Sequence, residues 1–253
     1  MSAAADSLPI AAVRRIGAVA LFFAQIIARI PAACLQPRLI VKQIYNAGAR
    51  SLVIVMSSGL FVGMVLGLLG FDVFQKFGSE ENVGVLAGLG NLRVLGPVLT
   101  ALLFAGRAGT SLTSEIGLMK STDQLTAMQM MAVDPVRYVV VPRFLGGFIA
   151  MPLLTATFTV IALYGAHLIT VQQMGVDAGA YWSQTQNAVE LRDVYEGIVK
   201  GFVFGTAVSL VAVYEGFHSE PTPEGVGLAT TRTVVTSSVL VLLLNYLLTA
   251  FFL

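Results

Sequence analysis

The sequence predicts an all-α polytopic membrane protein with five transmembrane helices, an N-terminal interfacial amphipathic helix and a cytoplasmic helix between two spans. Hydrophobic residues make up 56% of the 253 residues and charged residues only 11%, whereas a typical soluble domain is about 25% charged. Uncharged runs reach the roughly 20 residues that cross a bilayer. One polar stretch, residues 107–143, interrupts them. This composition excludes a soluble enzyme.

The five spans follow from the positions of these uncharged runs. The first covers residues 51–71 and the last covers 233–253, and both are free of charge. The third lies within 144–176, which is too long for one straight crossing and contains Pro152, a residue that kinks helices. The second and fourth spans each hold one basic residue, and they are expected at 83–106, with Arg93, and at 197–214, with Lys200.

The arm formed by residues 1–50 precedes the first span. Its uncharged run, residues 16–28, is short for a crossing and is flanked by arginines. We interpret it as an amphipathic helix lying in the cytoplasmic interface. A sixth span and a signal peptide remain alternatives.

Basic residues predict the orientation of the spans. Eleven Lys and Arg residues fall in the arm, the 107–143 loop and the loop at 215–232, whereas the opposite loops hold two. Because basic loops stay in the cytoplasm, the N-terminus is expected inside and the C-terminus outside. The segment 177–196 is then periplasmic. The permease domain would cover residues 51–253.

Glycines recur every fourth residue in two spans, at Gly59, Gly63 and Gly67 and again from Gly197 to Gly205. This spacing places small residues on one helix face and lets backbones approach closely. Packing within one chain is one interpretation, and a homodimer seam is the other. We favour a homodimer because five helices enclose little volume.

No catalytic, cofactor or metal motif is present in the sequence. It lacks a nucleophile elbow, a zinc-protease motif and the phosphate loop GxxxxGK[ST]. His167 and His218 are interpreted as structural or interface residues. A secondary transporter or channel for an amphiphilic substrate, and an intramembrane enzyme, remain the other functional classes.

The polar loop 107–143 is predicted to receive another subunit. Ser121 and Gln124 have capping-box spacing, which predicts a helix from Thr122 that ends at Asp134-Pro135. Glycine-rich turns are expected on either side of Arg107. Methionines cluster in this loop, and Leu125, Met128 and Met131 are expected on one adaptable face. Packing of that face on the protein's own spans is the alternative.

The order of motifs resembles the MlaE/YrbE permease family. It runs AGRAG at residues 105–109, EIGLM at 115–119, DQL at 123–125, Asp134-Pro135 and Pro142-Arg143. The resemblance extends from about residue 52 to the C-terminus. It implies the homodimeric inner-membrane permease of an ABC-type phospholipid transporter that maintains outer-membrane lipid asymmetry. It also implies two ATPase subunits, a hexameric periplasmic MCE-domain protein and a small cytoplasmic STAS-domain protein as partners, and no nucleic acid.

The resemblance further implies a coupling helix that inserts into a groove of the ATPase. The residues carried over to this element, with the two arginines that bracket it, are Arg107, Glu115, Gly117, Met119, Asp123, Leu125, Met128 and Arg143.

Arg93 is the most unusual residue, because a charge that deep in a span needs water or a partner. Where the family usually reads Leu-Arg-Glu-Leu-Gly-Pro, this chain has Val94 in place of the acid. This removes an obvious neighbouring partner and leaves Arg93 freer to bind an anionic lipid headgroup, with snorkelling as the alternative. The predicted lipid-binding residues are Arg93, Leu66, Val73, Phe74, Phe77, Leu95 and Lys200.

Overall fold

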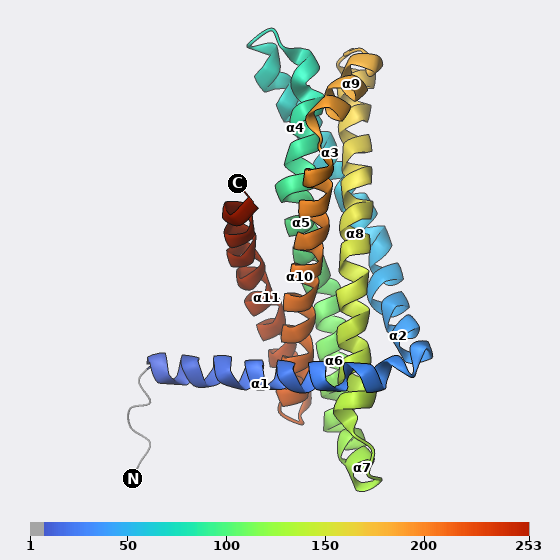
Figure 1. The fold of residues 1–253 in the computed structure, drawn as a ribbon, viewed down its shortest axis with the longest axis vertical. Helices are drawn as coiled ribbons and strands as arrows, with labels where there is room; N and C mark the ends of the chain where they lie inside the picture. Colours follow the sequence, from blue (N-terminus) through green and yellow to red (C-terminus); the bar gives the residue numbers. More distant parts are fainter. Residues whose placement is uncertain (1–7, 253) are drawn as a thin grey trace.

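A computed structural model describes residues 8–252, and within that range every regular element is helical. Five long helices form an upright bundle, and α1 (Leu8–Cys34) runs across one end of it (Figure 1). We call the end that α1 crosses the base. The five helices are long and apolar enough to cross a membrane, so the predicted fold class and number of spans are confirmed.

Each of the first three spans is a continuous helix that changes its hydrogen-bonding pattern along its length. The first span consists of α2 (Pro37–Ile44), η1 (Tyr45–Ala49) and α3 (Arg50–Gln75), and the second of α4 (Val83–Leu89), η3 (Gly90–Leu95), α5 (Gly96–Phe104), η4 (Ala105–Gly109) and α6 (Thr110–Ser121). The third span consists of η5 (Val136–Val140), α8 (Val141–His167) and η6 (Leu168–Gln173). The fourth is α10 (Leu191–His218), and the fifth is α11 (Pro223–Phe252). Shorter elements connect them, namely η2 (Glu80–Asn82), α7 (Gln124–Met130) and α9 (Ala178–Ala188).

The spans are longer than the uncharged runs that predicted them. The 39 residues from Pro37 to Gln75 form a helix of roughly 58 Å at 1.5 Å per residue, well beyond the ~30 Å of hydrocarbon. The turn expected around Arg107 is wrong, because η4 is π-helical and continues directly into α6. A continuous helix satisfies its own backbone hydrogen bonds, which a turn in this buried position would not. The third span likewise runs through Pro152 without ending.

Both glycine rows pack within the same chain, against α8 except for Gly197, which packs against Leu92 of η3. A Cβ added at Gly63 would lie 1.9 Å from the carbonyl oxygen of Ala162, and one at Gly67 would lie 2.8 Å from that of Ala166. On the other side of α8, a Cβ at Gly205 would lie 2.8 Å from the Cβ of Met151. Packing within one chain therefore accounts for the glycines. The homodimer stays a prediction.

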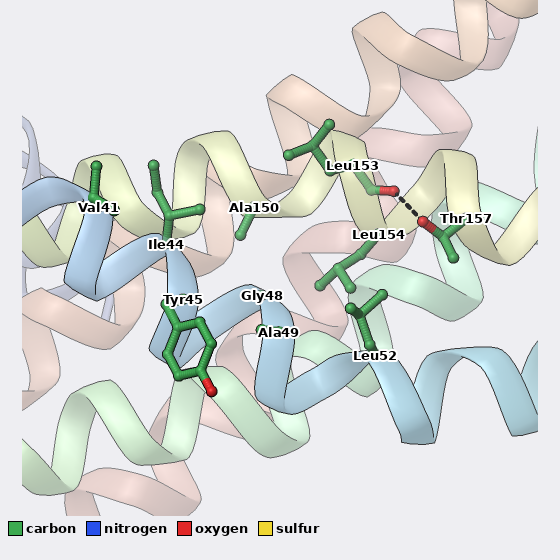
Figure 2. Close-up of a pocket in the computed structure, with 10 residues that line it drawn as sticks. All are labelled: Val41, Ile44, Tyr45, Gly48, Ala49, Leu52, Ala150, Leu153, Leu154 and Thr157. Atoms are coloured by element: carbon green, nitrogen blue, oxygen red, sulfur yellow. Dashed lines mark hydrogen bonds between the residues drawn. The ribbon is translucent and has the colours of Figure 1, made fainter.

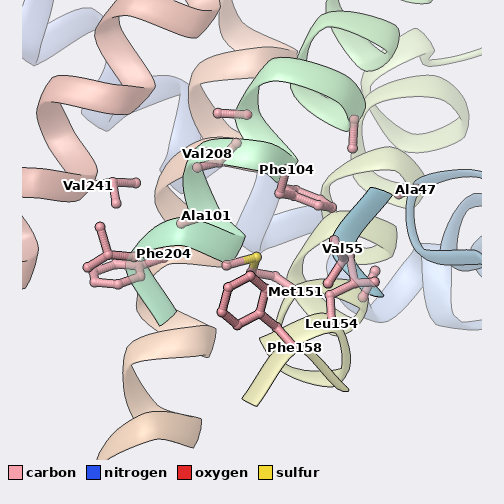
Figure 3. Close-up of a cluster of buried hydrophobic side chains, with 14 of the residues drawn as sticks. Ala47, Val55, Ala101, Phe104, Met151, Leu154, Phe158, Phe204, Val208 and Val241 are labelled. Atoms are coloured by element: carbon pink, nitrogen blue, oxygen red, sulfur yellow. The ribbon is translucent and has the colours of Figure 1, made fainter. Parts of the chain in front are cut away.

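Large side chains fill the centre of the bundle between α3, α5, α8 and α10. Figure 3 shows Phe104, Phe158 and Phe204 around Met151 in this core. The outward faces of α3 and α11 are instead apolar and exposed. The buried residues of α11 are only Gly225, Ala229, Thr233, Ser237 and Val241. These two faces are left for lipid or for another protein.

Only part of the predicted arm lies outside the bundle: residues 8–34 form one long helix, α1, in place of the short run expected at 16–28, and residues 37–50 belong to the first span. Phe22 and Ile26 of α1 are buried in a second core with Val140 and Phe144 at the base. Arg29 adds an ion pair to Asp134, with 2.5 Å between Nε and Oδ2. Because α1 lies across the bundle rather than within it (Figure 1), its geometry suits an interfacial helix, and its depth in a membrane stays a prediction.

Candidate functional site

Four charged side chains meet where α10 begins and α11 ends, at the opposite end of these helices from the base. Arg93 comes from η3, and Asp193, Glu196 and Lys200 come from α10. We call these four residues the outer cluster. Their spacing on α10 puts the three side chains on one helix face. A capping box between Glu190 and Asp193 starts α10 and fixes the position of the Asp193 carboxylate.

Arg93 has an ionic partner, contrary to the expectation drawn from Val94. Its Nε donates to Oδ1 of Asp193 at 2.6 Å. The Asp193 side chain is 0% exposed, whereas that of Arg93 is 46% exposed. The acid missing from the next position in sequence is therefore replaced by one that lies 100 residues away along the chain.

Lys200 is fully buried beneath this ion pair. Its Nζ donates to the backbone carbonyl of Arg93 at 2.5 Å and to Oγ1 of Thr249 on α11 at 3.0 Å. It thereby ties three spans together. Glu196, also buried, forms an ion pair with Arg192 at 3.4 Å.

Three members of the outer cluster, Arg93, Glu196 and Lys200, line a pocket of about 230 Å³. Arg93 bonds Asp193 through Nε alone, so its two terminal nitrogens have no hydrogen-bond partner among the described residues. A guanidinium presents planar donors that match phosphate oxygens in pairs. The arrangement can therefore hold an anionic headgroup while the buried acid orients the arginine. The residues lining the pocket are Arg93, Val94, Arg192, Glu196, Lys200, Thr249 and Phe252.

The structure brings together only part of the predicted lipid site. Arg93 and Lys200 meet in the outer cluster, and Leu95 is half-buried in η3. The other predicted residues, which lie on α3 or just after its end, do not line this pocket within one chain. These are Leu66, Val73, Phe74 and Phe77, of which Val73 and Phe77 are exposed. Sequence reasoning missed Asp193 and Glu196, although their spacing with Lys200 was a readable signal.

At the base, the two predicted bracketing arginines are held inside the chain. Arg107 donates to the carbonyl of Asn46 at 2.9 Å and to Oγ of Ser51 at 3.0 Å, which joins η4 to the first span. Arg143 pairs with Oε2 of Glu115 at 3.2 Å and contacts the sulfur of Met119 at 3.7 Å. Gly117 is also inside, because a Cβ there would lie 3.0 Å from Val226. Each arginine therefore fixes the second span against another span.

The capping box predicted at Ser121 is wrong. Ser121 lies in the last turn of α6 and its hydroxyl donates to the carbonyl of Leu118. The next helix, α7, begins at Gln124 after Asp123, whose φ is +55°. It ends at Met130 rather than at Asp134-Pro135, because Ala132 takes the left-handed conformation. The short polar side chain of Asp123 tolerates that conformation better than most.

Asp134 stabilises the loop after α7 instead of ending the helix. Burial raises the pKa of its carboxyl, but the hydrogen bonds from Arg29 and the Val136 backbone, with the positive charge of Arg29, outweigh this and lower it overall. The carboxylate therefore fastens α1 to the start of the third span.

The hairpin formed by α6 and α7 projects from the base of the bundle (Figure 1). Leu125 is only 6% exposed and packs with half-buried Met128 in the core at the base. The tip faces outward, with Met130 at 84% and Met131 at 68% exposed, beside exposed Leu118. We call the three large exposed apolar residues of the hairpin, Leu118 of α6 with Met130 and Met131, the hairpin tip. The predicted methionine face is thus divided, since Met131 is exposed while Leu125 and Met128 pack inward.

The two histidines pack among aromatic rings. His167 lies against Tyr181 and Trp182, each with a ring-centroid distance of 5.4 Å, and burial raises the pKa of Tyr181 to about 12. His218 lies 4.3 Å from the ring of Tyr214. Both positions suit the structural role predicted from sequence.

Comparison with known proteins gives consistent matches over most of the chain. The family described as "Permease MlaE" matches residues 40–251. The chain is 51% identical over 213 residues to an intermembrane phospholipid transport system permease protein MlaE of Haemophilus influenzae, which covers 84% of this chain and 82% of the relative. It is 39% identical to a probable ABC transporter permease of Rickettsia typhi, in an alignment that covers 83% of this chain and 82% of the relative. A probable ABC transporter permease of Synechocystis is 32% identical, in an alignment that covers 82% of this chain and 79% of the relative.

Proposed function

The chain belongs to the MlaE permease family, and from this premise we propose that it is the membrane subunit of an ABC-type phospholipid transporter. It moves phospholipid between the inner membrane and a periplasmic MCE-protein carrier, and so maintains the lipid asymmetry of the outer membrane. The observation that carries the proposal is the outer cluster, because a half-exposed arginine lines a pocket between apolar spans and two of its nitrogens bond no described residue. That chemistry fits an amphiphile with a phosphate.

The lipid is held as follows in this proposal. The terminal nitrogens of Arg93 bind the phosphate oxygens, and Asp193 keeps the guanidinium oriented from its buried position. Lys200 adds positive potential from below and keeps η3, α10 and α11 in register. The acyl chains lie against apolar residues. A second copy of the chain brings the exposed Val73 of α3, and Phe77 just after that helix, to this headgroup site.

Energy comes from partner subunits, since the sequence has no phosphate loop of its own. Two ATPase subunits bind the hairpin tips of a homodimer, where exposed methionines offer an adaptable apolar contact. Movement of the hairpin reaches the bundle through Glu115 and Arg143. A hexameric MCE-domain protein sits on the periplasmic face and a small STAS-domain protein on the cytoplasmic face. The N-terminus is then cytoplasmic and the C-terminus periplasmic in the inner membrane.

Reconstitution with the ATPase subunit tests this function. The purified chain and its ATPase are placed in vesicles with a labelled phospholipid, and transfer to a periplasmic carrier protein is followed with and without ATP. We expect ATP-dependent transfer. The double variant Met130→Asp/Met131→Asp should abolish ATPase capture and transfer while the chain stays folded, because both side chains are exposed.

Arg232→Gln is the matched control, since Arg232 is exposed on α11 with no ion pair to a described residue. It should capture ATPase and transfer lipid like the parent. Transfer that continues without ATP or ATPase would instead indicate a secondary transporter. ATPase capture by the double variant at parental strength would remove the hairpin tip from the coupling role.

A further inference from the structure

An apolar groove runs up the outside of the bundle near the base, away from the outer cluster. Its volume is about 290 Å³. One wall comes from α2, η1 and the start of α3, and the other comes from α8 (Figure 2). The residues lining it are Val41, Ile44, Tyr45, Gly48, Ala49, Leu52, Ala150, Leu153, Leu154 and Thr157.

The groove lining offers no polar group to a ligand except the Tyr45 hydroxyl. The Thr157 hydroxyl is already used, because it donates to the carbonyl of Leu153 at 2.8 Å (Figure 2). Two small residues form the floor, and a Cβ added at Gly48 would lie 3.3 Å from that of Ala150. Such a surface selects hydrocarbon.

The length of the groove matches one leaflet. From Val41 to Leu52 the helix rises about 16 Å, and the hydrocarbon core of a whole bilayer is about 30 Å thick. Tyr45 is 61% exposed near the lower end of the groove, as expected for a tyrosine at the headgroup level of a membrane. A single acyl chain of the leaflet next to α1 would therefore fill the groove from end to end.

Positive charge gathers at the base end of this groove, and the helices that form its walls carry no acidic residue along the groove. Arg38 lies three residues before Val41, and Lys42 lies three before Tyr45, so both continue the helix face that lines the groove. Both are exposed, and neither forms an ion pair with a described residue. Neither residues 37–71 nor residues 141–167 contain an Asp or Glu.

Nearby acids are already neutralised by other arginines. Asp134 pairs with Arg29, and Glu115 pairs with Arg143. The excess positive charge at the end of an apolar groove is complementary to one kind of occupant. Basic side chains near the membrane surface attract anionic headgroups, by about fivefold in affinity for each cation.

We propose that this groove binds one anionic phospholipid of the leaflet next to α1. One acyl chain lies between α3 and α8, and the phosphate contacts Arg38 and Lys42. The site is distinct from the outer cluster, which lies at the other end of α10 and α11. Its lipid holds the first span against the third at the level where η1 interrupts the regular helix.

Tryptophan quenching by brominated lipid tests the proposal on the full chain. The sequence has a single tryptophan, Trp182, so Trp182→Phe/Tyr45→Trp leaves one fluorophore in the groove. Vesicles of phosphatidylcholine and phosphatidylglycerol are prepared with bromine near the headgroup end of the acyl chains of one lipid or the other. We expect phosphatidylglycerol to quench at least fivefold more effectively than its mole fraction predicts.

Four further variants complete the design. Arg38→Gln/Lys42→Gln should bring the quenching by phosphatidylglycerol close to the value that its mole fraction predicts. Ala49→Phe should have the same effect, because it fills the groove while the cations remain. Arg232→Gln, which removes one exposed cation elsewhere, should leave the preference unchanged. A tryptophan at Val239 on the exposed face of α11, in place of that at Tyr45, should show no preference.

The results that overturn the proposal are equally distinct. Quenching in proportion to mole fraction would mean that the groove is ordinary lipid-facing surface, and no quenching by either lipid would mean that a second copy covers it. A preference that survives Arg38→Gln/Lys42→Gln would exclude these cations from recognition. Arg93→Ala should leave the preference intact, so a failure at the outer cluster and a failure here are separately visible.

Discussion

The ion pair between Arg93 and Asp193 gives the most informative perturbation, because it separates folding from lipid binding. Arg93→Ala leaves the Asp193 carboxylate buried without its guanidinium. Removing one partner of a fully buried pair costs about 3–5 kcal/mol. Arg93 is about half exposed, and Asp193 keeps a hydrogen bond of 2.9 Å from the backbone of Glu190. We therefore expect a loss of about 2 kcal/mol, seen as a fall of about 4–8 °C in the unfolding midpoint.

The double variant Arg93→Ala/Asp193→Asn removes both charges and should recover most of this stability. Its lipid transfer should stay low, because the nitrogens that meet the phosphate are gone. Arg93→Lys keeps the charge but not the planar fork, so it should transfer lipid at an intermediate rate. Thermal unfolding of the full chain in detergent measures the stability of each variant. ATP-dependent transfer of labelled phospholipid in vesicles measures its transfer rate.

Either of two results would refute this reasoning. If Arg93→Ala unfolds at the parental temperature, the ion pair contributes nothing and the buried acid has another partner. If the stable double variant transfers lipid at the parental rate, Arg93 serves folding alone. Arg232→Gln, which loses a cation that forms no ion pair with a described residue, should match the parent in both assays.

Three other perturbations follow from the described contacts. Gly63→Ala should lower the unfolding midpoint strongly, because its Cβ would lie 1.9 Å from a backbone oxygen of α8. Gly227→Ala, whose Cβ would meet no described atom within 4 Å, should be neutral or stabilising. Equal midpoints for the two variants would contradict the packing of α3 on α8. Asp134→Asn should loosen α1 by less than about 1 kcal/mol. Since the pKa of Asp134 is lowered on folding, its contribution is present above about pH 4 and is lost as pH falls through the lowered pKa. Hydrogen-exchange protection factors of α1 in the parent, corrected for the intrinsic exchange rate at pH 7 and pH 3, measure this. Equal protection factors at the two pH values would contradict it. Cysteines placed at Lys120 and after Leu253, in a chain without its native cysteine, should react with an impermeant reagent from opposite sides of the membrane, and labelling from one side would overturn the orientation.

Local properties of the chain determined the membrane fold. Five spans, an apolar arm outside the bundle and a polar hairpin between the second and third spans could all be predicted from runs of hydropathy and charge. These properties depend on neighbouring residues only, since a helix in lipid satisfies its own backbone hydrogen bonds. The ends of the elements were predicted less well, as at Ser121 and around Arg107, where the chain continues as helix through glycines that usually favour turns.

The pairing of side chains across helices was decided only by the tertiary structure. Hydropathy does not indicate which face of a span turns inward when the helix is apolar all round. For that reason the sequence could not show that Gly63 packs on Ala162, that Leu125 is buried at the base, or that Arg93 meets an acid 100 residues away. Each of these contacts depends on the rotation and register of two helices. Both are set by close packing between segments that are distant in the chain, and so the candidate lipid site became visible only in the folded bundle.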